Sequence, residues 1–86
     1  MIEKTLKALS DPTRLKIVEV LEEGEVCACK FTTITKKAQP TVSQHLKILE
    51  NAGIIKSRKE GKNVMYSVAD KRVFDLIKIA REIGKR

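Results

Sequence analysis

The chain of 86 residues lacks most of the features that mark an enzyme or a membrane protein. It has one histidine, no glycine-rich phosphate loop and no pair of acidic residues in a pocket-forming context, so we do not expect an enzyme. No apolar run approaches the roughly 18 residues needed to span a bilayer. The N-terminus has no signal-peptide pattern. These absences predict a soluble, cytoplasmic protein without a membrane partner.

Linkers, internal repeats and low-complexity segments are also absent, and the chain is too short for two domains. We therefore expect residues 1–86 to form a single domain. A chain of this length buries only about 60 to 65% of the surface that its unfolded form exposes. Further burial against a partner subunit is a reasonable expectation.

The net charge of +7 is spread unevenly along the chain. Residues 1–29 carry a net −2, residues 30–69 carry eight cations against two anions for a net +6, and residues 70–86 carry a net +3. A merely lysine-rich soluble protein would spread its charge more evenly. Positive charge concentrated on one segment indicates a surface for a polyanion such as DNA.

The clearest helix signal lies within residues 39–53. Pro40 suits the first helical position, and Gly53 suits the left-handed residue just after a helix end. Between them, one apolar stripe at spacings of four and three residues must be buried. The stripe consists of Val42, Leu46 and Leu49.

The opposite side of this helix is polar but not acidic. Its side chains can donate to and accept from base edges and phosphates, although a merely solvated helix face would look similar. His45 borders the apolar stripe, where a packed, hydrogen-bonded histidine is favoured over a base or phosphate contact. The candidate DNA-binding residues of this helix are Gln39, Thr41, Ser43, Gln44 and Lys47.

Three further helices are predicted before it. The first covers about residues 1–10. The second opens with Asp11 or Ser10 as N-cap and Pro12 at its first position, and it stops at Gly24. A third helix is expected over residues 25–35, followed by a turn of residues 35–38 that lacks glycine. Two helices joined by a short turn, the second with a polar outer face, form a helix-turn-helix.

After Gly53 the apolar period changes from 3.6 to 2. Two alternating segments, 55–59 and 64–68, flank a turn of residues 60–63, which predicts a β-hairpin with a basic tip. Such a hairpin directly after a helix-turn-helix is a wing placed to lie along phosphates or in a minor groove. Its candidate DNA-binding residues are Arg58, Lys59, Lys62 and Asn63.

Asp70 is expected to cap a last helix that runs to about Ile83. Apolar residues cover well over half of its circumference, which implies a second burial surface, although a terminal helix tucked onto its own domain is an alternative. We expect a homodimer formed through about residues 1–10 and 71–84. The predicted fold class is mostly α with a β-hairpin wing (α+β), a winged helix-turn-helix in the order αααα-ββ-α.

Cys27 and Cys29 are the only thiols, at the start of the predicted third helix. The helix dipole and neighbouring Lys30 would favour thiolates there, whereas the alternative is a pair of small buried hydrophobes. On an intact helix these side chains point about 200 degrees apart. Both sulfurs could bind one ion only if the first turn of the helix unwinds. That distortion would be transmitted to the 39–53 helix. A thiolate pair selects ions such as Zn, Cd, Cu(I) or trivalent arsenic.

These residues resemble the ArsR/SmtB family of metal-sensing winged-helix repressors nearly end to end. The segment L-K-A-L-S-D-P-T-R-L-K-I-V looks like the family's opening, and E-V-C-A-C-K-F looks like its metal-binding box. Q-P-T-V-S-Q-H-L-K-I-L-E-N-A-G-I-I looks like its recognition helix, and R-K-E-G-K-N-V-M-Y-S-V looks like its wing. The C-x-C box resembles that of the arsenic and cadmium-lead branch. Arsenic sensors often have a third cysteine where this chain has Thr32.

The resemblance implies a homodimer that represses transcription by binding a pseudo-palindromic DNA operator without any cofactor. It would release the operator when a thiophilic ion, such as arsenite, antimonite, Cd, Zn or Pb, binds Cys27 and Cys29. Gln39, Ser43 and Gln44 would contact the major groove. Alternatives are a thiol redox switch, a regulator without ligand, or a winged-helix module that binds proteins.

Overall fold

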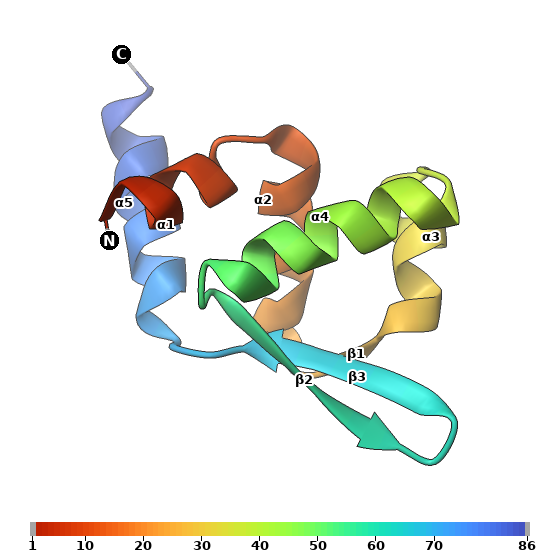
Figure 1. Cartoon of the computed structure of the whole chain (residues 1–86). Coiled ribbons are helices and arrows are strands. Elements are labelled where there is room, and N and C mark those ends of the chain that lie inside the picture. Colours follow the sequence, from red (N-terminus) through yellow and green to blue (C-terminus); the bar gives the residue numbers. More distant parts are fainter. Residues whose placement is uncertain (1, 86) are drawn as a thin grey trace.

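The computed structural model describes residues 2–85, which form helices packed against a small antiparallel sheet (Figure 1). Most of the helices lie on one side of the sheet, and the hairpin extends away from them. The elements are α1 (Ile2–Leu9), α2 (Pro12–Val20), the 3₁₀ helix η1 (Leu21–Glu23), β1 (Val26–Cys27), the 3₁₀ helix η2 (Ala28–Lys30), α3 (Phe31–Thr35), α4 (Gln39–Asn51), β2 (Ile55–Glu60), β3 (Asn63–Val68) and α5 (Arg72–Ile83). No helix within residues 2–85 is both long enough and apolar enough to cross a bilayer.

The core is built from the apolar stripes that the sequence predicts. The side chains of Val42, Leu46 and Leu49 on α4 are buried, which confirms the stripe of this helix. They join the fully buried Ile17 and Val18 of α2. Phe31, also fully buried, and residues at the start of β2 complete the cluster. Burial of these stripes fixes how α2 and α4 are rotated about their axes.

The helix ends agree closely with the predicted signals. Asp11 is the N-cap of α2, where its side chain accepts a hydrogen bond of 3.0 Å from the backbone N–H of Arg14, and Pro12 is the first helical residue. Helix α4 begins one residue earlier than expected, so Pro40 is its second residue. Gly53 follows it with a φ of +75°. In the turn without glycine, Lys36 takes the left-handed conformation with a φ of +59°.

The prediction of one helix over residues 25–35 is wrong. Only residues 31–35 are α-helical, because Val26 and Cys27 are extended and pair with the outer side of β3, and residues 28–30 form the 3₁₀ helix η2. Val26 lies opposite Tyr66 and Cys27 opposite Met65, which satisfies backbone groups that would otherwise form an open sheet edge. The hairpin is therefore part of a three-stranded sheet of order β1-β3-β2.

The last helix starts slightly later than predicted. Its first residue is Arg72, and Lys71 occupies the N-cap position. Asp70 still satisfies the helix start, because its Oδ1 accepts a hydrogen bond of 2.9 Å from the backbone N–H of Arg72. Apolar side chains remain exposed along α5 and α1, as the wide apolar arc predicts. They include Ile2, Leu6, Leu76, Ile79 and Ile83.

We predict that Phe31→Ala lowers the free energy of unfolding by about 3 to 5 kcal/mol, because it removes a fully buried ring from the centre of the core. Thr33→Ala, on the exposed side of the same helix, should change it by less than about 0.5 kcal/mol. Urea unfolding at one fixed protein concentration compares the two. Equal midpoints for both variants would contradict the assignment of Phe31 to the core.

Candidate nucleic-acid interface and thiol pair

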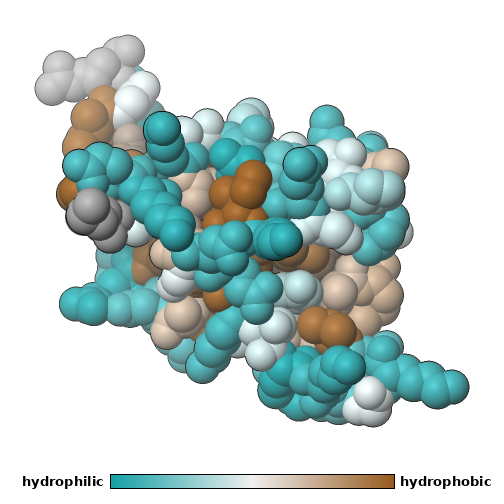
Figure 2. Space-filling model, in the orientation of Figure 1, coloured by the Kyte–Doolittle hydropathy of each residue, from teal (hydrophilic) through white to brown (hydrophobic). Residues whose placement is uncertain are grey.

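The polar face of α4 is free in this structure. All five residues predicted to read DNA from this helix have exposed side chains, and Gln39 Nε2 donates a hydrogen bond of 3.1 Å to Ser43 Oγ. Figure 2, in the orientation of Figure 1, shows a largely hydrophilic surface over α4 and the hairpin. The helix presents a row of donors and acceptors that can contact base edges and phosphates.

Contacts on both flanks hold α4 in place. On one side, Ser57 of β2 donates a hydrogen bond of 3.0 Å to Glu50. On the other side, Arg14 Nη1 lies 3.2 Å from His45 Nδ1, and Arg14 Nε donates to the carbonyl of Ala8 at 2.7 Å. A guanidinium only donates, so His45 Nδ1 must be the acceptor. The expectation of a packed, hydrogen-bonded histidine is confirmed.

The hairpin of β2 and β3 forms a projecting wing, and we use this name for residues 55–68 (Figure 1). Its two strands pair from Ile55 opposite Val68 to Glu60 opposite Asn63, so Gly61 and Lys62 form the turn. Gly61 has a φ of +62°, which suits glycine at the first position of a tight hairpin turn. Lys59, Lys62 and Asn63 are exposed near this tip, where a phosphate backbone can reach them.

Arg58 differs from the other candidates of the wing because its guanidinium is already paired. Its Nε and Nη2 donate to the two carboxylate oxygens of Glu25 at 2.7 and 2.6 Å, and Nη2 also lies 2.7 Å from Glu60 Oε2. The hydrogen bonds from Arg58 hold the pKa of Glu25 below its ordinary value. Glu25 is 33 residues away from Arg58 in sequence, and no local pattern indicates the pair.

Cys27 and Cys29 lie side by side, and the structure joins their sulfurs in a disulfide. Cys27 has an extended backbone, with φ −65° and ψ 137°, and its Sγ accepts a hydrogen bond of 3.3 Å from the backbone N–H of Cys29. The unwinding that would bring both sulfurs to one centre is thus present in the fold. Once reduced to thiolates, the two side chains fit a thiophilic ion, with two sulfurs supplied by the chain.

A third ligand is not provided by the usual residue types. Within residues 2–85, no group of three or more His, Cys, Asp and Glu side chains could hold a metal ion. Cys29 is exposed, so further ligands can come from solvent. The ligands that the described residues offer at this position are therefore the two sulfurs.

The thiol pair is connected to both elements that are predicted to contact DNA. Through η2 and α3 it leads to the turn at Lys36 and then to α4. Through β1 it is hydrogen-bonded to β3 of the wing, since Cys27 is the register partner of Met65. The sequence indicates the first connection but not the second.

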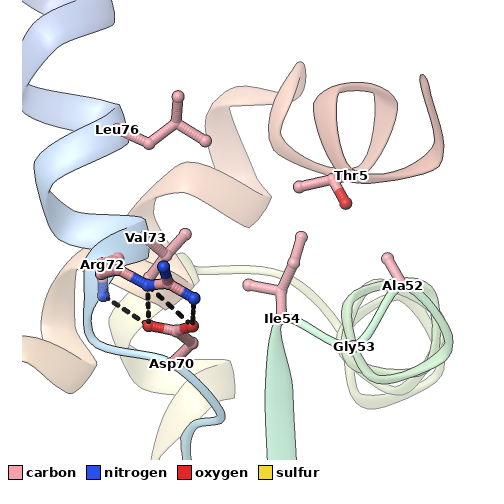
Figure 3. Close-up of a pocket in the computed structure, with 8 residues that line it drawn as sticks. All are labelled: Thr5, Ala52, Gly53, Ile54, Asp70, Arg72, Val73 and Leu76. Atoms are coloured by element: carbon pink, nitrogen blue, oxygen red, sulfur yellow. Dashed lines mark hydrogen bonds and ion pairs between the residues drawn. The ribbon is translucent and has the colours of Figure 1, made fainter. Parts of the chain in front are cut away.

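A separate pocket of about 400 Å³ opens between α1, α5 and the α4–β2 corner (Figure 3). Arg72 and Asp70 form an ion pair of 2.7 Å at one side of it, and the hydrogen bonds from Arg72 lower the pKa of Asp70 to about 2. Leu76 and Val73 of α5 face Thr5 of α1 across the opening. The pocket adjoins the exposed apolar side chains of α1 and α5, away from the thiol pair.

Comparison with known proteins gives a consistent result. Residues 11–57 match the family model described as bacterial regulatory protein, arsR family. The chain is 50% identical over 78 residues to an uncharacterised HTH-type transcriptional regulator of Methanocaldococcus jannaschii, covering 90% of this chain and 88% of the relative. It is 49% identical over 80 residues to a cadmium resistance transcriptional regulatory protein CadC homologue of Staphylococcus aureus, covering 92% of this chain and 66% of the relative.

Among solved structures, the chain resembles a homodimeric winged helix-turn-helix DNA-binding domain from Mycobacterium bovis, described as a possible ArsR-family transcriptional regulator. The TM-score is 0.85 and the identity is 28%, covering 94% of this chain and 78% of that one. The transcriptional repressor BigR from Xylella fastidiosa gives a TM-score of 0.84 and 30% identity, covering 99% and 87%.

Proposed function

This chain belongs to the arsR family of bacterial regulatory proteins, and we propose that it is a homodimeric repressor released from operator DNA by a thiophilic ligand. The family consists of transcriptional regulators rather than enzymes. The observation that carries the proposal is the exposed polar face of α4, flanked by a basic wing, on a segment with a net charge of +6. A regulator of this kind acts in the cytoplasm, on chromosomal or plasmid DNA.

Helix α4 would enter the major groove. Gln39, Ser43 and Gln44 are placed to contact base edges, because an amide or hydroxyl can both donate and accept there. Thr41 and Lys47 would contact the flanking phosphates. Since the phosphate contacts set the register and the base contacts set the sequence preference, these two groups have separable effects.

The wing would add contacts to the adjoining backbone or minor groove. Lys59, Lys62 and Asn63 at its tip are exposed. Each lysine that neutralises a phosphate releases a counterion, which makes affinity fall with salt concentration. Arg58 can contribute only when it leaves Glu25, which accepts hydrogen bonds from both its Nε and its Nη2.

We place the dimer contact on residues 1–10 and 71–84 of the single domain 1–86. Ile79 and Ile83 of α5 are 55% and 68% exposed, and Ile2 of α1 is 70% exposed. Isolated chains seldom leave so many large apolar side chains on two adjacent helices. Two-fold pairing presents two copies of α4. The operator should therefore be pseudo-palindromic, with half-sites about one helical turn apart.

Cys27 and Cys29 would bind the ligand. A bound soft ion such as arsenite, antimonite, Cd, Zn or Pb supplies a centre that holds two thiolates together. The relatives named as regulators of cadmium and arsenical resistance support this class without fixing the ion. DNA binding itself needs no ligand, because α4 and the wing are held by contacts within the chain.

A redox switch is the second candidate, and the disulfide between Cys27 and Cys29 in this structure favours it. In this case two thiols lose two protons and two electrons to a peroxide, which leaves as water. A metal ion bound to the thiolates would be displaced. Both candidates use the same two sulfurs and differ in the agent that joins them.

We predict that Lys59→Ala/Lys62→Ala weakens binding to every duplex and makes the dependence of log K on log salt less steep. The slope changes by about 0.9 for each phosphate that is no longer neutralised, or about 3.6 for two lysines in each of two chains. Lys16→Ala/Lys85→Ala, with the same charge change at exposed positions outside the wing and outside the proposed dimer contact, is the matched control. Equal slopes for the two variants would argue against the wing and favour a protein-binding module.

We predict that Gln44→Ala relaxes sequence preference. A bidentate base contact discriminates against the wrong base by about 1 to 3 kcal/mol, so the variant should lose about that much at one operator position. Selection from a randomised duplex pool with the wild type defines the site, and competition with single-base variants measures the preference. A uniform loss of affinity for all duplexes would show that Gln44 does not contact a base.

We predict that Cys27→Ser/Cys29→Ser binds DNA with wild-type affinity but does not respond to cadmium or arsenite. The wild type should lose about 5- to 150-fold in affinity, the usual range of coupling between two sites. Fluorescence anisotropy of a labelled duplex in phosphine-reduced buffer measures the DNA affinity of each protein with and without the ions. If the wild type ignores both ions but responds reversibly to hydrogen peroxide and dithiothreitol, the redox candidate replaces the metal candidate.

A further inference from the structure

The thiol pair and the wing share one face of the sheet. Met65 of β3 is the register partner of Cys27 on one side and of Arg58 on the other. Residues directly opposite each other in an antiparallel sheet project to the same face. The neighbouring row contains Tyr66, whose ring packs edge-on against Phe31 at 6.2 Å and so marks the core face. Cys27, Met65 and Arg58 therefore project outward together.

The Arg58 side chain spans this outward face and ends on Glu25, the residue directly before β1. Its guanidinium reaches from β2 across β3 to Glu25, two residues before Cys27, with hydrogen bonds of 2.6 and 2.7 Å. The geometry is a two-pronged arginine–carboxylate pair, the arrangement in which arginine also binds a phosphate. Glu25 thus occupies the donors that Arg58 would offer to DNA.

Extending the function proposed above, we propose that Glu25 and a DNA phosphate compete for Arg58, and that the thiol pair decides the outcome. When the two sulfurs are held together, Glu25 retains Arg58 and the wing binds one phosphate fewer. When the sulfurs are apart, Arg58 is transferred to the phosphate. Ligand binding then weakens the DNA contacts of the wing as well as those of α4.

The structure explains why the sulfurs control Glu25. Strand β1 is only two residues long, so apart from the sulfurs the backbone beside Glu25 is held by two register pairs to β3 and by the packing of Val26 on the core. Held together, Cys27 and Cys29 keep residue 27 extended and its Sγ on the backbone N–H of Cys29. In this structure the two sulfurs are held together, and Arg58 forms its ion pair with Glu25. Parted sulfurs remove that constraint from β1.

The test uses phenylarsine oxide to hold the sulfurs together in the phosphine-reduced full-length dimer. The arsenic forms one bond to each sulfur, and its oxygen leaves as water with the two thiol protons. The salt dependence of DNA binding is measured with and without it. In the wild type, the slope of log K against log salt should be about 1.8 less steep with the arsenical, since one Arg58 per chain leaves its phosphate.

Two variants should abolish this difference in opposite ways. Glu25→Gln removes that carboxylate and leaves Arg58 only its Nη2 contact with Glu60 on the wing, so its Nε stays available to a phosphate and the steep slope should persist with the arsenical. Arg58→Gln removes the phosphate-binding group in both states, so the shallow slope should appear even without it. Glu60→Gln is the matched control, because Glu60 pairs with Arg58 within the wing and not through β1. It should retain the wild-type difference.

The outcomes separate this inference from the function on which it rests. If the wild type responds to the arsenical and Glu25→Gln keeps the full slope difference, the competition for Arg58 is refuted and ligand release stands. If mass spectrometry shows one arsenical per wild-type chain and DNA binding does not change, ligand release itself fails, and the inference fails with it. Should Glu25→Gln not fold, Arg58→Gln decides: a slope that still changes with the arsenical overturns the competition.

Discussion

The burial of one apolar stripe on α4 is the constraint on which the DNA-facing surface depends. Val42, Leu46 and Leu49 can enter the core only if the helix takes one rotation about its axis, and that rotation turns the polar side outward. Hydrogen bonds from Ser57 and Arg14 then fix the helix from both flanks. The wing is continuous with α4 through Gly53, so the same packing also sets where its basic tip lies.

A second constraint is the pairing of β1 with β3. It opens the start of the predicted third helix and places Cys27 on the edge of the sheet that forms the wing, with Cys29 in the 3₁₀ helix that follows. The thiols therefore have a direct mechanical connection to the wing, in addition to the path through α3 to α4. A short strand held by few backbone hydrogen bonds is easily displaced, which suits a segment that has to respond to a small ligand.

The sequence predicts the elements whose signals are local and leaves out those that depend on distant partners. The stripe of α4, the Asp11 cap and the hairpin follow from spacing and turn residues within each segment. Strand β1 could not be predicted, because its two residues carry no period and their partners lie about 40 positions later. The Glu25–Arg58 pair could not be predicted for the same reason, because its two residues are 33 positions apart. Lys36 supplies the left-handed residue of a turn that lacks glycine, in a conformation that side chains adopt less readily.

The central claim is that α4 and the wing tip form the surface that contacts DNA. Amide hydrogen exchange of the dimer with and without a bound duplex tests it most directly, because each backbone site reports its own protection. Slower exchange on binding is predicted at residues 39–47 and 58–63, with little change in α2. Protection confined to α5, or none along α4, would contradict the account.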